Sequence, residues 1–117
     1  MNVLIWYPKC STCKNAKKYL EDNNIKFDLR DIKCETPNTK ELDKLISLSN
    51  KDIKAFFNTS GLVYKKLNLK DKLQKMSYDE KLNLLANDGM LIKRPILIYN
   101  DKVLVGFKKD VWNEIIK

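Results

Sequence analysis

The chain has 117 residues, and its 23 lysines and arginines against 15 aspartates and glutamates give it a net charge of +8. A chain of this length builds a hydrophobic core without disulfide staples, so we expect residues 1–117 to form a single domain. The absence of histidine excludes Cys-His and Ser-His-Asp nucleophiles and HExxH metal sites. The basic residues are spread along the chain without a nucleic-acid-binding motif, so we expect no direct contact with nucleic acid.

The first predicted element is a short buried strand, because the five apolar residues Val3–Tyr7 end at Pro8. Helix-forming residues follow over Asn15–Leu20, which predicts a strand-to-helix junction. Two thiols, Cys10 and Cys13, stand at this junction. The free N–H groups and the positive dipole end of a helix N-terminus favour an anion, so Cys10 is predicted to be a reactive thiolate. Cys13 lies one turn further on the same face, within disulfide reach, and can resolve a mixed disulfide on Cys10.

The next elements complete a βαβ unit, after which the chain becomes helical. Apolar and charged residues alternate over Ile25–Leu29, which predicts a second strand. Capping-box patterns at Asn38 with Glu41, and at Ser77 with Glu80, each predict the start of a helix. A short helix, a turn and a helix stop are predicted at Ile53–Phe57, Asn58–Gly61 and Asn87–Gly89. The sequence therefore predicts a helical insertion over about 38–90.

The pattern returns to strands after Pro95. Apolar and β-branched runs at Ile96–Tyr99 and Val103–Val105 flank the turn sequence Asn100–Lys102, which predicts an antiparallel hairpin. A last helix is predicted from Lys109. The order βαβ, helical insertion, ββα is that of an α/β, thioredoxin-like fold with a mixed sheet.

The remaining cysteine and the aromatic residues carry weaker signals. Cys34 follows the second predicted strand and has no partner in the sequence, so we expect a passive thiol. A structural zinc site would need a fourth ligand beyond the three thiols, and no glycine-rich phosphate loop occurs, so we expect neither a metal nor a cofactor. We interpret five aromatic side chains as core residues: Trp6, Tyr7, Phe56, Phe57 and Trp112.

Cysteine usage and hydropathy indicate a compartment. The chain has three cysteines, no signal-peptide pattern and no apolar run near the roughly 18 residues that a membrane span needs. We therefore expect a cytoplasmic monomer without membrane contact. In a reducing compartment a CxxC pair is more often catalytic or sensory than structural.

Three segments carry a specific resemblance to a known family. They are Cys10–Lys14, Tyr64–Leu69 and Leu91–Ile98. Together they resemble the ArsC/Spx family, which includes glutaredoxin-dependent arsenate reductases and Spx-type transcriptional regulators, and the resemblance spans essentially the whole chain. It implies that Arg94 lies near Cys10, where a guanidinium would lower the thiolate pKa and hold an oxyanion, and that Pro95 is a cis proline facing the active site.

The resemblance also implies a set of site residues. The catalytic residues would be Cys10, Cys13 and Arg94. The substrate would contact their neighbours Ser11, Thr12, Lys14 and Pro95.

The chain differs from both branches of the family. The arsenate-reductase branch is similar in its nucleophilic cysteine, but it has serine at the second cysteine position and two further arginines where this chain has Asn58 and Phe107. The Spx branch has the CxxC pair, but it carries a glycine in the loop where Asn50–Asp52 stand and an arginine in place of Ser60 or Gly61.

Three functions therefore stay open. The first is a thiol–disulfide oxidoreductase of the arsenate reductase-like family that cycles a Cys10–Cys13 disulfide, with glutaredoxin or thioredoxin as reductant. The second is an Spx-type, redox-switched transcriptional regulator that binds RNA polymerase. The third is a glutaredoxin-dependent arsenate reductase, against which the two missing arginines weigh, because lysine does not supply the planar donor fork of arginine.

Overall fold

The computed structural model describes residues 2–116, which form a four-stranded sheet with helices on both faces. In chain order the elements are β1 (Val3–Trp6), α1 (Ser11–Asp22), β2 (Asp28–Asp31), α2 (Thr39–Ser49), η1 (Ile53–Phe56), α3 (Leu62–Lys66), α4 (Leu69–Lys72), η2 (Leu73–Lys75), α5 (Tyr78–Asn87), η3 (Gly89–Leu91), β3 (Ile96–Tyr99), β4 (Lys102–Val105) and α6 (Lys109–Ile116). Within residues 2–116, no helix has the length and apolar character to cross a membrane.

The sheet is mixed, with the strand order β2-β1-β3-β4. β1 runs parallel to β2, with Val3 opposite Asp28, and antiparallel to β3, with Ile5 opposite Ile96. β3 and β4 form the predicted antiparallel hairpin. Because β1 and β3 are antiparallel neighbours in the middle of the sheet, the end of β1 and the start of β3 lie side by side at the same end of the strands. This topology brings the cysteine loop after β1 beside Arg94, which precedes β3.

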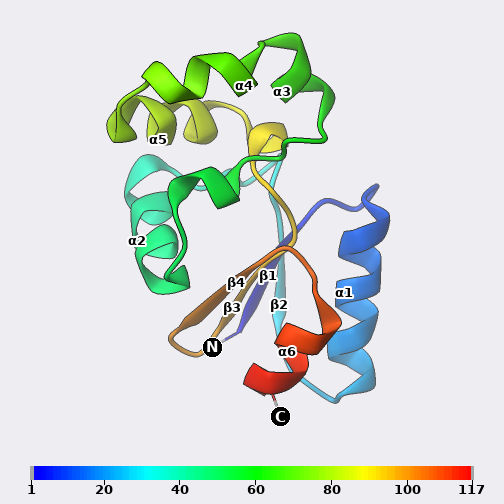
Figure 1. The fold of residues 1–117 in the computed structure, drawn as a ribbon. Coiled ribbons are helices and arrows are strands. Elements are labelled where there is room, and N and C mark those ends of the chain that lie inside the picture. The colour runs from blue at the N-terminus through cyan, green and yellow to red at the C-terminus, as the bar shows by residue number, and fades with distance from the viewer. Residues whose placement is uncertain (1, 117) are drawn as a thin grey trace.

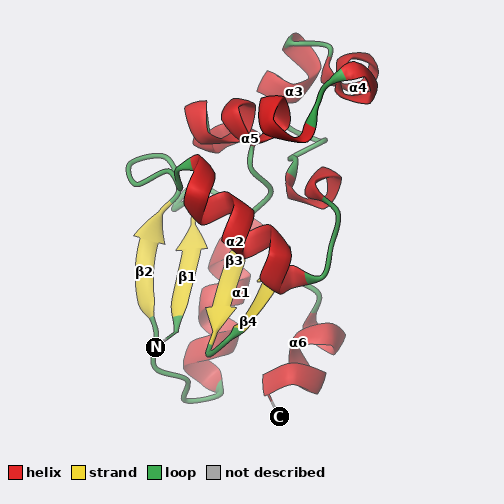
Figure 2. Ribbon diagram, turned by 90° about the vertical axis from the view of Figure 1, so that its left-hand side faces the viewer, coloured by secondary structure: helices red, strands yellow, loops and turns green. Residues whose placement is uncertain are grey.

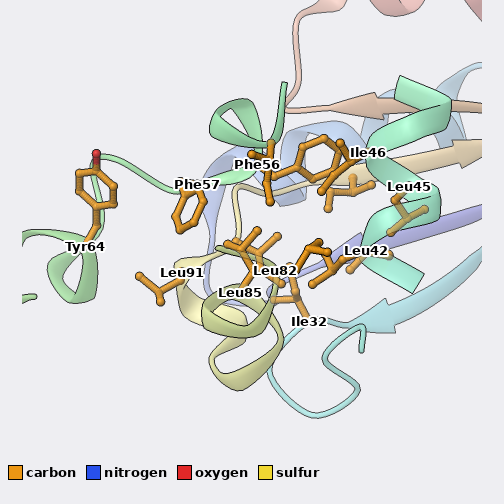
Figure 3. Close-up of a cluster of buried hydrophobic side chains, with 14 of the residues drawn as sticks. Ile32, Leu42, Leu45, Ile46, Phe56, Phe57, Tyr64, Leu82, Leu85 and Leu91 are labelled. Atoms are coloured by element: carbon orange, nitrogen blue, oxygen red, sulfur yellow. The ribbon is translucent and has the colours of Figure 1, made fainter. Parts of the chain in front are cut away.

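The sheet separates two hydrophobic clusters. Side chains alternate along a strand, so the buried Leu4 packs with α1 and α6 on one face, while Ile5 packs with α2 on the other. Figures 1 and 2 show α1 and α6 on one side of the sheet and α2 lying across the opposite side. The cluster around Ile5 continues into the helical insertion, where Phe56 and Leu85 are fully buried (Figure 3). One core therefore joins the insertion to the sheet.

Both predicted capping boxes are present. The side chain of Asn38 accepts the Glu41 N–H at 2.8 Å, and that of Ser77 accepts the Glu80 N–H at 3.1 Å. Helix α5 ends at Asn87 as predicted, but Gly89 is not its left-handed cap. A Cβ at Gly89 would lie 2.2 Å from the Ile32 carbonyl oxygen, so glycine is needed there for close packing.

Several element boundaries differ from the prediction, and β4 begins at Lys102 rather than Val103 because Lys102 pairs with Tyr99. The second strand is Asp28–Asp31 rather than Ile25–Leu29, because its pairing with β1 begins opposite Val3. The apolar alternation that suggested the earlier start comes from Ile25 and Phe27, whose side chains pack with α1 and α6 although these residues precede the strand pairing, and the Ile25 N–H donates to the Leu20 carbonyl. The first strand ends at Trp6, and the short helix after α2 ends at Phe56, because Phe57 forms a β-bridge with Ile92.

Candidate active site

Cys10 is the N-cap residue of α1. Its backbone is extended, its N–H donates to the Tyr7 carbonyl at 3.0 Å, and its own carbonyl accepts the Lys14 N–H at 3.0 Å. Its sulfur accepts the backbone N–H of Cys13 at 3.4 Å, so it takes the place of the oxygen that usually caps a helix. The first turn of α1 contains no acidic residue. An anion at the Cys10 sulfur therefore faces free N–H groups without an opposing charge.

The two thiols have unequal environments. Cys13 has no exposed surface, and its burial raises the pKa of its thiol to about 12. A hydrogen bond to the Cys10 sulfur and the charge on that sulfur act in the same direction, while the Tyr7 N–H and the charge of Arg94 oppose them. Near neutral pH, Cys13 is a thiol that donates its proton toward Cys10.

Cys10 is the residue of the pair that holds the negative charge. Its partial burial raises the pKa, but hydrogen bonds from the Cys13 thiol and from the backbone N–H groups of Cys13 and Thr12, together with the charge of Arg94, lower the pKa by more. The net pKa of Cys10 lies below its ordinary value. The thiolate is the nucleophilic form of cysteine, so this arrangement separates an attacking sulfur from a protonated one.

Arg94 is close enough to influence both sulfurs, although it comes from the other half of the chain. Its Cζ lies 5.3 Å from the centre of the Tyr7 ring. Its Nη1 donates weakly to the carbonyls of Met90 and Ile92, at 3.4 and 3.5 Å, and its buried Nε has no hydrogen-bond partner. The Arg94–Pro95 peptide bond is cis in this structure, and Pro95 is buried.

The other predicted site residues lie on the first turn of α1, except for Pro95. Ser11, Thr12 and Lys14 are exposed there, and of these three only Thr12 lowers the pKa of the Cys10 thiol, through its backbone N–H. Cys34 is an exposed, free thiol after β2, and its backbone N–H donates to the Asp31 carboxylate at 3.2 Å. Within residues 2–116, no three side chains form a group that could hold a metal ion.

Tyr7 is a site residue that the sequence analysis missed. We interpreted it as a core aromatic, and its side chain does pack against the core cluster that contains Ile5. Its ring also faces Arg94, and its backbone contacts both cysteines. No local pattern identifies this role, because the contact with Arg94 depends on the pairing of β1 with β3.

Asn58 and Phe107 have structural roles of their own. The backbone N–H of Asn58 donates to the Leu91 carbonyl at 2.7 Å and ties the end of η1 to the segment before β3. The Phe107 ring lies edge-on to Trp112 at 4.7 Å and packs 5.6 Å from Tyr19. Phe107 therefore belongs to the core between α1 and α6, and it supplies no hydrogen-bond donor to an anion.

The sequence profile of the ArsC family matches residues 5–115 of this chain. The chain belongs to the ArsC family. This ArsC-family chain is 52% identical over 109 residues to the uncharacterized protein YusI of Bacillus subtilis (strain 168), covering 93% of this chain and 92% of YusI. It is 35% identical over 101 residues to the regulatory protein MgsR of the same organism, covering 86% of this chain and 79% of MgsR.

The fold agrees with that membership. A crystal structure of an ArsC-family-related protein from Bacteroides fragilis superimposes with a TM-score of 0.94 at 46% identity, covering 97% of this chain and 96% of that chain. The CxxC pair and the α/β fold with its mixed four-stranded sheet are thus features of an ArsC-family protein related to YusI and MgsR.

Proposed function

We propose that this ArsC-family protein is a thiol–disulfide oxidoreductase that cycles through a Cys10–Cys13 disulfide in the reducing cytoplasm. The observation that carries the proposal is the unequal pair of thiols. Cys10 caps α1 with a lowered pKa, and the buried Cys13 has its pKa raised to about 12. A passive pair of cysteines has no need for such a difference, whereas attack and resolution require it.

The first step is attack of the Cys10 thiolate on a disulfide of the substrate protein. The new bond joins Cys10 to one substrate sulfur, the substrate disulfide breaks, and the other substrate sulfur leaves as a thiolate. In the second step Cys13 loses its proton and attacks the Cys10 sulfur, which releases the remaining substrate thiolate. One substrate thiolate takes the proton that Cys13 released and the other takes a proton from solvent, so both end as thiols, and two electrons have passed from the cysteine pair to the substrate.

The same contacts explain how Cys13 becomes reactive at the right moment. The charge on Cys10 and the hydrogen bond to it raise the pKa of Cys13. Once Cys10 is in a mixed disulfide, that charge is gone, while the Tyr7 N–H and the charge of Arg94 still favour a Cys13 thiolate. Formation of the mixed disulfide therefore lowers the pKa of the resolving thiol.

A dithiol reductant of the glutaredoxin or thioredoxin class would reduce the Cys10–Cys13 disulfide by donating two electrons, and its own two thiols would become a disulfide. In this scheme Arg94 acts on the sulfurs, and Ser11, Thr12, Lys14 and Pro95 surround the approaching substrate. We expect the protein to act as a monomer.

A second candidate function is redox-dependent regulation through RNA polymerase. The regulatory protein MgsR, at 35% identity, is the observation that favours it. In that role the same disulfide would change a binding surface instead of transferring electrons to a substrate. Arsenate reduction has less support, because Asn58 and Phe107 stand where further arginines would be needed, and Phe107 is committed to the core.

The experiment that tests the proposal is to trap partners on a Cys13→Ser variant, which removes the resolving step so that mixed disulfides on Cys10 accumulate. We expect disulfide-linked partners, with glutaredoxin or thioredoxin among them. The matched control is Cys10→Ser with Cys13 intact, which should trap far less, and Cys34→Ser should leave the yield unchanged. Equal trapping by the two single variants would contradict the assignment of Cys10 as nucleophile. Co-purification of RNA polymerase only with the oxidised protein would favour the regulator.

A further inference from the structure

Tyr7 contacts all three central residues of the site. Its carbonyl accepts the Cys10 N–H at 3.0 Å, and its backbone amide lowers the pKa of the Cys13 thiol. Its ring lies 5.3 Å from the Cζ of Arg94. One residue therefore holds the Cys10 backbone, acts on the Cys13 thiol and contacts the guanidinium with its ring.

The guanidinium of Arg94 has few other constraints. Its two hydrogen bonds, to the Met90 and Ile92 carbonyls, are long, and its Nε has no partner. Among residues 2–116, no carboxylate forms an ion pair with Arg94. The Tyr7 ring is thus the principal side-chain contact described for this charge.

We propose that Tyr7 is a positioning residue whose ring holds Arg94 beside Cys10 without neutralising it. A carboxylate would also fix a guanidinium, but its negative charge would cancel much of the field that Arg94 exerts on the thiolate. An aromatic face attracts a cation through its quadrupole and carries no net charge. The inference rests on the proposed function, in which Cys10 reacts as a thiolate stabilised by Arg94.

This role has a specific consequence for variants. The Tyr7 ring acts on Cys10 only through Arg94, so weakening the ring and removing the guanidinium should not have additive effects. A residue that merely fills the core would behave differently, because loss of packing would lower stability whether or not Arg94 were present. The hydroxyl of Tyr7 makes no described hydrogen bond, so phenylalanine should serve as well as tyrosine.

The test replaces Tyr7 by phenylalanine and by phenylalanines with increasing fluorination, which keep the ring's shape and apolar character but weaken its attraction for a cation. The measurement is the rate of iodoacetamide alkylation of Cys10 against pH, located by mass spectrometry. Tyr7→Phe should keep the wild-type midpoint. Full fluorination should raise the midpoint and slow alkylation at pH 7 by about two- to fivefold. Tyr64→Leu, in the same core cluster but not in contact with Arg94 in the described structure, is the packing control and should not move the midpoint.

The same series in an Arg94→Met background shows whether the Tyr7 ring changes the alkylation midpoint of Cys10 through Arg94 or independently of it. We expect fluorination to have no influence there. The positioning role is wrong if Arg94→Met raises the midpoint and fluorination does not, or if fluorination raises it equally in both backgrounds. Absence of trapped partners on Cys13→Ser, together with a midpoint that still follows fluorination, would reject the proposed function and leave the positioning role intact.

Discussion

At the scale of single residues, two cysteines three positions apart differ because one lies at the helix end and the other one turn inside. Backbone N–H groups and the charge of Arg94 lower the pKa of the Cys10 thiol, whereas the Cys13 side chain has no exposed surface. The sequence predicted the position of Cys10 at the helix N-terminus, since a strand followed by helix formers locates that end, and Cys10 is the N-cap of α1. It did not predict the strength of the effect on Cys13, because burial depends on what packs above the helix.

The raised pKa of Cys13 makes a prediction about stability at high pH. In the unfolded chain Cys13 loses its proton near its ordinary pKa of roughly 8.5, whereas in the folded protein it keeps the proton until about pH 12. Between these values the unfolded state binds fewer protons, so stability falls as pH rises, by up to about 1.4 kcal/mol per pH unit. Urea unfolding of wild type and Cys13→Ala from pH 8 to 11 should show a steeper loss in wild type. Parallel curves would mean that Cys13 titrates as an ordinary thiol.

The position of Arg94 beside Cys10 could not be predicted from local sequence. Taken alone, a residue before a strand is most simply a surface arginine, and only the family resemblance placed it near Cys10. The structure gives the physical reason, which is the antiparallel pairing of β1 with β3. The contact with Tyr7 follows from the same pairing and could not have been inferred from either segment by itself.

At the scale of elements, capping chemistry determined the boundaries that the sequence predicted best. Helices α2 and α5 begin at the two capping boxes. These boundaries are predictable because the residues that form the sequence pattern also make the hydrogen bonds that start the helix. The boundary of β2 was wrong for the opposite reason. Strand limits depend on the partner strand, and side-chain alternation at Ile25 and Phe27 continues beyond the paired residues.

The two capping boxes differ in one respect that allows a matched test. Glu41 also accepts two hydrogen bonds from Arg30, at 2.8 and 3.2 Å, and so ties α2 to β2, whereas Glu80 has no such partner among the described ion pairs. We expect Glu41→Ala to lower the free energy of unfolding more than Glu80→Ala. The additional loss should be about 0.5–1 kcal/mol, because the Arg30–Glu41 pair is partly exposed to solvent.

A double-mutant cycle isolates that contribution. In an Arg30→Ala background, Glu41→Ala should cost about as much as Glu80→Ala does in the wild type, as measured by urea unfolding. If the excess cost of Glu41→Ala persists without Arg30, the ion pair is not what joins the strand to the helix.

At the scale of the whole molecule, the order of elements predicted the architecture, because βαβ followed by a hairpin and a helix has few ways to bury its apolar faces. The sequence did not predict how the insertion is attached. Its helices share one hydrophobic core with a sheet face, from Ile5 to Leu85, and α2 lies across that face (Figure 2). Cys10 follows β1, and Arg94 leads from the insertion into β3, so the candidate site lies where the two halves of the chain converge.

This arrangement also limits how an oxyanion site could be completed. Phe107 packs edge-on against Trp112, so arginine at position 107 would disturb the core between α1 and α6 at a cost of about 1–3 kcal/mol. Asn58 is half-buried, and its described hydrogen bond to Leu91 comes from the backbone, so arginine at position 58 should leave that bond intact.

The last prediction follows from this difference. Unmodified protein should reduce arsenate poorly in a glutaredoxin-coupled assay, and Asn58→Arg should increase oxyanion affinity in calorimetry by about 1–3 kcal/mol if the new guanidinium reaches a desolvated site. Adding Phe107→Arg should increase affinity further while lowering the urea midpoint. Asn83→Arg, which adds the same charge on the exposed face of α5, controls for net charge and should change neither quantity much. Robust arsenate reduction by the unmodified chain would mean that one arginine suffices beside Cys10, and arsenate reductase would then replace disulfide oxidoreductase as the first candidate function.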